Sequence, residues 1–283
     1  RDEMAERIKA STLFTRDLAG RCRAARRTWR LSEDQTVDWV TGLVNSTPDL
    51  VRQARGGLSR AYLLIVNTPR ECVVGGDRQD VARLVERLGC YFVPAPGVTT
   101  VHCEVVRSVQ KKYRELHLFE TTPPPGVRIY SAAWGRAYDP TPDAAADSIL
   151  AQALETMDFP RLIDQAYQDG VRLFLEMGPG ASCTRMIPAI LEDRPHAAWA
   201  AYAAGRDPEA SLLKALARAF APGIPVDLSP LYGKEPGGPI DLIAGPPGPG
   251  IATPPGPDLS TSPRPLGTAH RPKGRAIPAQ SPG

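Results

Sequence analysis

The sequence predicts an α/β fold in which a small ferredoxin-like subdomain is inserted into a larger α/β subdomain. Residues 36–97 carry the pattern order strand–helix–strand–strand–helix–strand, which is typical of the split βαβ, ferredoxin-like unit. Residues 98–233 alternate helix and strand patterns, which indicates a sheet covered by helices. Residues 234–283 are dominated by proline and glycine and are predicted to form a disordered linker, because they cannot bury enough apolar surface to offset their ordering entropy.

The elements of the first 97 residues follow from periodicity and from capping residues. Residues 1–35 are predicted to be a helical remnant of the larger subdomain, since Met4, Ile8 and Leu13 recur at roughly helical spacing. Thr47 is a typical N-cap with proline behind it, and Asp77 caps a second helix. The small subdomain is expected to hold strands at 37–44, 62–66, 71–75 and 91–93 and helices at 47–54 and 77–88.

The larger subdomain is read in the same way. Gly170 is predicted to end one helix, and the apolar run after it to be a strand. The run Gly178-Pro179-Gly180 is predicted to turn that strand into the next helix. The expected helices are 103–116, 143–154, 159–168, 181–191 and 212–220, and the expected strands are 127–131, 171–176 and 197–202.

Composition excludes several classes of function. A net charge of +3 and an aromatic content of 6% argue against nucleic-acid binding. No apolar run approaches the roughly 18 to 20 residues of a membrane helix. The five cysteines are scattered and never in C-x-x-C spacing, which argues against a disulfide framework and a zinc site and favours the reducing cytoplasm. The chain begins at Arg1, with no signal peptide, and we expect an upstream portion to be missing.

His102 is the best candidate for chemistry by position. It follows a Pro/Gly-rich turn and a short β-branched run, and loops at strand ends are where open α/β sheets place reactive groups. An imidazole with an ordinary pKa of about 6.5 can act as base or acid near neutrality. His117 and His196 lack such a setting and are expected at the surface, and His270 lies in the tail.

Three segments carry a family resemblance. They are Val66-Asn67-Thr68-Pro69 with the strand after it, Val101-His102-Cys103, and Glu176-Met177-Gly178-Pro179-Gly180. In this order they resemble the second half of the acyltransferase domain of fatty acid and polyketide synthases. The resemblance covers residues 1–233 and is nearest to multidomain polyketide and polyunsaturated fatty acid synthases. It implies an incomplete acyltransferase large subdomain around the ferredoxin-like one.

The resemblance also implies roles for residues. His102 corresponds to the general base and acid. Asn67 would line the acyl pocket, or would shape its own turn by a backbone hydrogen bond. Glu176 and Gly178 would lie beside the histidine and complete the substrate site, with backbone carbonyls of their loop orienting the imidazole. The implied substrate is a malonyl- or other acyl-CoA, and the implied partners are the phosphopantetheine thiol of an acyl carrier protein and the other synthase domains. No cofactor or metal bound by the chain itself is implied.

The family's nucleophile is absent, because no G-H-S-x-G elbow occurs in the chain. Ser59 and Ser182 lack the final glycine that a strained elbow needs, and Cys103 and Cys183 are interpreted as structural. The arginine that pairs with a malonyl carboxylate in many members would lie upstream of Arg1, so malonyl selectivity is not readable. The chain alone is therefore expected to be inactive.

Two alternatives remain open at this point. The first concerns the kind of protein. The chain is either part of an acyltransferase or a degenerate acyltransferase-like module kept for docking or structure, and such a module would cover its own sheet edges and apolar faces. The second concerns the arginine run at residues 21–30, which is either a solvated helix face or a basic groove for an acidic carrier protein.

Overall fold

The structure is a computed structural model, which describes residues 2–32, 34–95, 100–202, 205, 207–220, 223 and 225–229. The chain divides into two units, Arg1–Val226 and Asp227–Gly283, and the account below concerns the first. The predicted linker 234–283 lies outside the described residues.

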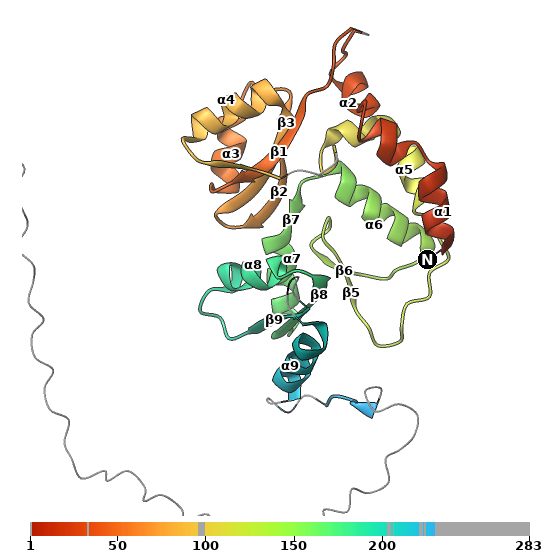
Figure 1. Cartoon of the computed structure of the whole chain (residues 1–283), viewed down its shortest axis with the longest axis vertical. Helices are drawn as coiled ribbons and strands as arrows, with labels where there is room; N and C mark the ends of the chain where they lie inside the picture. Colours follow the sequence, from red (N-terminus) through yellow and green to blue (C-terminus); the bar gives the residue numbers. More distant parts are fainter. Residues whose placement is uncertain are drawn as a thin grey trace, which may run out of the picture. The chain divides into compact units, whose positions relative to one another are not determined.

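This unit contains a five-stranded mixed sheet with strand order β4-β1-β3-β2-β7 (Figure 1). Its strands are antiparallel except for β7, which runs parallel to β2. The strands are β1 (Trp39–Val44), β2 (Ala61–Thr68), β3 (Glu71–Asp77), β4 (Phe92–Pro94) and β7 (Met157–Asp158).

One face of the sheet is covered by α3 (Pro48–Ala54) and α4 (Arg78–Leu88). Thr47 accepts the backbone N–H of Leu50 and Asp77 accepts those of Gln79 and Asp80, as expected of N-caps. Leu63 and Val66 of β2 point to this face and pack with the apolar side chains of both helices.

The other face packs on helices from three distant parts of the chain. Tyr62 and Leu64 of β2 share one apolar cluster with Ala25, Val105 and Ala153. Trp29 donates from Nε1 to the Tyr62 hydroxyl at 2.9 Å. The helices on this face are α1 (Asp2–Ala10), the π-helix η1 (Leu13–Asp17), α2 (Arg23–Thr28), the 3₁₀ helix η2 (Glu104–Val109), α5 (Gln110–Leu116) and α6 (Pro142–Leu154). Because β2 is covered on both faces, it reads as an almost continuous apolar run.

One glycine of the sheet is fixed by sterics. Gly76 has φ +143°, and a Cβ on it would lie 1.9 Å from the carbonyl oxygen of Arg60. Only glycine allows β2 and β3 to approach this closely.

The remaining elements follow β7. They are α7 (Phe159–Gln168), β8 (Leu173–Pro179), α8 (Ser182–Leu191), β9 (Ala197–Tyr202) and α9 (Pro208–Phe220). Strands β8 and β9 form a parallel two-stranded sheet, and a hairpin of β5 (Ile129–Ser131) and β6 (Arg136–Tyr138) lies separately.

Several expectations need correction. The single helix expected at 103–116 is a 3₁₀ segment followed by α5, and the 1–30 helix is three short ones. Asn67 and Thr68 belong to β2, not to a turn, because β2 stays paired with β3 as far as Thr68. Strands β6 and β7 were not expected, being only three and two residues long.

His117 was expected at the surface and is buried instead. Its Nδ1 is 2.8 Å from the carbonyl oxygen of Tyr113, and its ring packs against the Tyr113 ring with centroids 4.7 Å apart. A satisfied hydrogen bond and an aromatic neighbour offset the cost of burying this polar ring.

No helix among the described residues is long and apolar enough to cross a membrane.

Candidate functional site

The C-terminal end of α6 holds His102 at three points. The backbone N–H groups of His102 and Cys103 both donate to the carbonyl oxygen of Ala153, at 2.7 and 3.2 Å. The imidazole Nδ1 lies 2.6 Å from the carbonyl oxygen of Gln152. These carbonyls are available because the last four of a helix have no partner within it.

This arrangement fixes the chemistry of the ring. A carbonyl only accepts, so Nδ1 carries the proton and Nε2 is left with the lone pair that a base needs. The residue adopts φ +64°, a left-handed conformation that is uncommon outside glycine and is found at functional sites. The imidazole of His102 is thus half-buried, and a backbone carbonyl orients it.

Burial lowers the pKa of His102 below its ordinary value of 6.5, while the hydrogen bond to the Gln152 carbonyl opposes that shift. The ring is therefore neutral near pH 7, as a general base must be.

We expect an NMR titration of the His102 ring to show a midpoint below 6.5, with Nδ1 as the protonated nitrogen of the neutral form. The unfolded chain binds this proton near pH 6.5 and the native chain only at lower pH. Unfolding free energy should therefore fall as pH decreases from about 6.5 through the native pKa. A midpoint above 6.5, or a neutral ring protonated on Nε2, would contradict this geometry.

Asn67 lies at the end of β2 in a second polar group. Its Nδ2 donates to Glu71 Oε1 at 2.9 Å, across the β2–β3 hairpin. Arg185 of α8 donates to both oxygens of the same carboxylate, at 3.0 and 3.1 Å. The Arg185 hydrogen bonds lower the pKa of Glu71, with a further contribution from Asn67. The sequence analysis named Asn67 as a candidate but not its neighbours Glu71 and Arg185, which are 114 residues apart in the chain.

Glu176 caps α8. Its Oε2 accepts both the backbone N–H and the hydroxyl of Thr184, each at 2.8 Å. Burial raises the pKa of Glu176, but the hydrogen bonds of Thr184 outweigh it and keep the pKa below the ordinary value. The Glu176 carboxylate therefore stabilises the N-terminus of α8.

Gly178 is exposed near the end of β8, and its carbonyl accepts the N–H of Gly180 at 2.8 Å. A Cβ on Gly178 would meet nothing within 4 Å. Its surroundings leave room for a ligand or for another chain segment.

The structure links the predicted residues only in part. Met157 and Asp158 of β7 pair with Ile65 and Val66, directly before Asn67, and Gln152 Nε2 lies 3.1 Å from Met157 Sδ. The residue that holds the imidazole is thus joined to the strand of Asn67, and Arg185 joins Asn67 to α8.

Across the described ranges, no hydrogen bond connects His102 with Glu176 or Gly178. The carbonyl on the imidazole comes from Gln152, not from the 176–180 loop, because the chain after His102 lies against the end of α6. The expected helix end at 154 was the one sequence signal for this contact.

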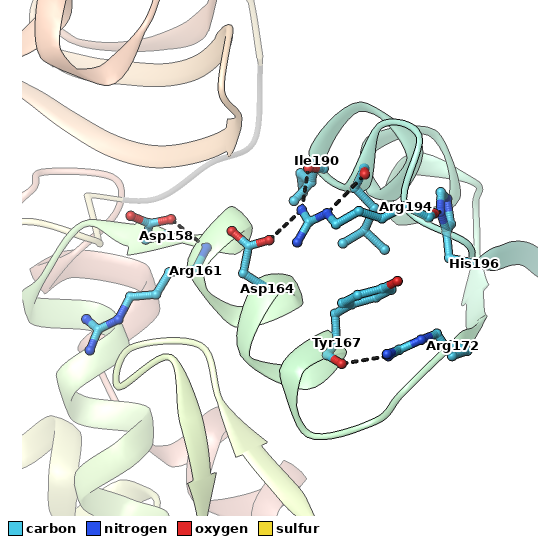
Figure 2. Close-up of polar contacts among 9 residues, drawn as sticks. Asp158, Arg161, Asp164, Tyr167, Arg172, Ile190, Arg194 and His196 are labelled. Carbon is cyan, nitrogen blue, oxygen red and sulfur yellow. Dashed lines mark hydrogen bonds and ion pairs between the residues drawn. The ribbon is translucent and has the colours of Figure 1, made fainter.

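A polar cluster fastens α7 to α8 and the β8–β9 region (Figure 2). Asp158 accepts the backbone N–H of Arg161 at 3.0 Å and caps α7. Arg194 pairs with Asp164 at 2.7 Å, and the Arg172 guanidinium lies 3.7 Å from the centroid of the Tyr167 ring. Since Asp158 also belongs to β7, this cluster positions the strand next to Asn67.

Neither candidate cysteine has the environment of a nucleophile. Burial raises the pKa of Cys103 to about 12, and it raises the pKa of Cys183 as well. A thiol that stays protonated at neutral pH neither attacks nor binds metal.

Comparison with solved structures shows that the chain shares the fold of acyltransferase domains. The acyltransferase domain from the second module of the salinomycin polyketide synthase matches with a TM-score of 0.62 at 22% identity, over 75% of this chain and 50% of that one. A malonyl-CoA–acyl carrier protein transacylase from Clostridium perfringens matches with a TM-score of 0.53 at 17% identity, over 70% and 61%.

Two curated relatives match the chain. One component protein of the polyunsaturated fatty acid synthase of Thraustochytrium sp. is 24% identical over 82% of this chain and 12% of its own length. The polyketide biosynthesis protein ThaF of Burkholderia thailandensis is 26% identical over 56% of this chain and 13% of its own length. No family model matches the chain. The chain thus shares its fold with acyltransferase domains, and two curated relatives are named for polyunsaturated fatty acid synthesis and polyketide biosynthesis. It spans about half of the salinomycin domain and about an eighth of the curated relatives.

Proposed function

We propose that the chain is the C-terminal part of an acyltransferase domain that moves a malonyl or other acyl group from CoA to the phosphopantetheine thiol of an acyl carrier protein. The observation that carries the proposal is the neutral, backbone-held imidazole of His102 with Nε2 free. The salinomycin domain and the Clostridium transacylase, which share the fold, are named for acyl transfer.

The proposed chemistry has two halves. In the first, Nε2 of His102 takes the proton of a serine hydroxyl supplied by a segment outside this chain, and the serine oxygen forms an ester with the acyl group as the CoA thiolate leaves. The imidazolium then protonates that thiolate. In the second half the carrier thiol gives its proton to Nε2, its sulfur attacks the ester, and the serine oxygen takes the proton back.

Asn67, Glu71 and Arg185 are proposed to shape the substrate side of this centre. Their network fixes the end of β2 against α8, and Glu176 fixes the start of α8. Gly178 is exposed, with nothing within 4 Å of the position of a Cβ, and we propose that the substrate lies beside it.

We further infer that residues 36–97 are a ferredoxin-like subdomain forming one wall of the acyl channel. The antiparallel order β4-β1-β3-β2, with α3 and α4 packed on the same face, supports this assignment.

The uncovered part of β8 favours this proposal over a self-sufficient docking module. Within the described residues β8 pairs along one edge only, with β9. The side chains of Leu175 and Met177 are 45% and 70% exposed. Another segment added to this sheet would cover them, whereas a complete module would have covered them itself.

We expect the chain alone to remain unlabelled by radioactive malonyl-CoA, and an equimolar mixture with a separately expressed acyltransferase N-terminal half carrying G-H-S-x-G to become labelled. The label should resist neutral hydroxylamine and be released by alkaline hydroxylamine, as expected of a serine oxygen ester, and tandem mass spectrometry should place it on the added half. Stoichiometric labelling of this chain on its own would overturn the missing-nucleophile proposal.

A further inference from the structure

The arginines of α2 line hollows in the surface. Ala24 and Ala25 are fully buried against Val105 and Val106 of η2, so the remaining side chains of α2 are forced outward. Three hollows open there, and Arg23 lines all of them. The largest of the three, of about 700 Å³, lies between α2, η2 and α5.

This largest hollow, here called the basic groove, is strongly cationic. Arg23, Arg27, Arg107, Lys111 and Lys112 line it, against the acids Asp17 and Glu115. Asp17 accepts from Lys112 Nζ at 2.8 Å, and Glu115 lies 3.9 Å from Lys111 Nζ, so both acids are already engaged. Within the part of the chain that the structure describes, Arg23, Arg27 and Arg107 form no ion pair.

Unpaired guanidinium groups gathered around a concave surface favour an anionic partner, because they repel one another until opposite charge is brought in. One residue of the groove follows the candidate base closely in the chain. Arg107 is in η2, which begins two residues after His102, and at about 2 Å per residue of 3₁₀ helix it is about 10 Å along the chain from His102.

We propose that the basic groove is the docking surface for the acidic helical face of an acyl carrier protein, an inference that rests on the proposed function. A carrier seated there would release its phosphopantetheine arm beside η2, on the side from which the chain reaches His102. One solved structure similar to this chain is a type II polyketide synthase carrier protein in complex with its malonyl-transacylase, with a TM-score of 0.55 at 16% identity over 70% of this chain and 62% of that one.

The test is the affinity of the whole chain for a purified holo acyl carrier protein, measured by biolayer interferometry at low and at physiological salt. The variant Arg23→Glu/Arg27→Glu/Arg107→Glu should raise Kd at least tenfold at low salt and flatten its salt dependence. The matched control is Arg52→Glu/Arg83→Glu/Arg128→Glu. It makes the same charge change at exposed arginines on α3, on α4 and before β5, each of which pairs with one carboxylate. It should leave Kd within about twofold.

Each outcome decides the proposal. An unchanged Kd in the groove variant, an equal loss in the control, or binding of poly-glutamate as tight as that of the carrier overturns it. If the triple variant does not fold, Arg27→Glu/Arg107→Glu, at two exposed positions, replaces it. The measurement needs no acylated serine, so a failure of binding is distinguishable from a failure of the proposed transfer chemistry.

Discussion

Replacing His102 by asparagine should lower kcat/KM for malonyl transfer about 10²- to 10⁴-fold in the domain reconstituted from the two halves, since loss of a general base has this typical effect. Asparagine is the informative substitute because, unlike most residues, it tolerates the left-handed backbone that φ +64° requires. The backbone hydrogen bonds to Ala153 can therefore persist while the proton acceptor Nε2 is lost.

The matched control is His196→Asn, at a half-buried histidine whose Nδ1 lies 2.7 Å from the carbonyl of Arg194. It should retain activity within about threefold. Steady-state transfer of labelled malonyl groups to a carrier thiol measures both variants. Turnover of His102→Asn close to that of the unchanged protein would remove His102 from the mechanism.

Truncating Leu64 to alanine should lower the free energy of unfolding by about 2–5 kcal/mol, the usual result for a leucine enclosed in a packed core. Leu64 is fully buried in β2 and belongs to the cluster that joins the sheet to α2, η2 and α6. The cavity would open beside the helix end that holds His102, since Ala153 is in the same cluster.

Urea unfolding followed by circular dichroism measures this loss, provided that the slope m is unchanged. Leu50→Ala is the control, because Leu50 on α3 is 53% exposed and its truncation should cost less than about 0.5 kcal/mol. A loss below about 1 kcal/mol for Leu64→Ala would show that the two layers are not tightly packed through β2.

The elements most accurately predicted from sequence are those with both a cap and an apolar stripe. Asp77 and the spacing of Val81 and Leu84 located α4, and Thr47 with Pro48 located α3. Their signals are local, so no knowledge of the rest of the chain was needed. Strand β7 has only two residues and exists because β2 offers it a parallel partner, which is a tertiary reason invisible to periodicity.

In the candidate site, too, some residues have a local sequence signal and others are brought together only by the fold. His102 was chosen as a candidate from its position between a turn and a helix, and its catalytic role stays a prediction. Gln152, whose carbonyl oxygen contacts the imidazole, has no sequence signal other than the expected helix end. The ion pair between Glu71 and Arg185 joins residues that only the folded sheet brings together. The prediction that His117 lies at the surface was wrong. The carbonyl oxygen and the ring of Tyr113, four residues earlier on α5, contact the imidazole and allow it to be buried.

The second edge of β8, to which no strand pairs within the described residues, also has a consequence for handling the protein. Such an edge beside the exposed side chains of Leu175 and Met177 is a template for pairing with a second molecule. Concentrated samples should therefore self-associate, with light scattering that rises with concentration. Replacing Met177 by lysine should suppress that association, because a charge on an exposed edge opposes the joining of two such strands.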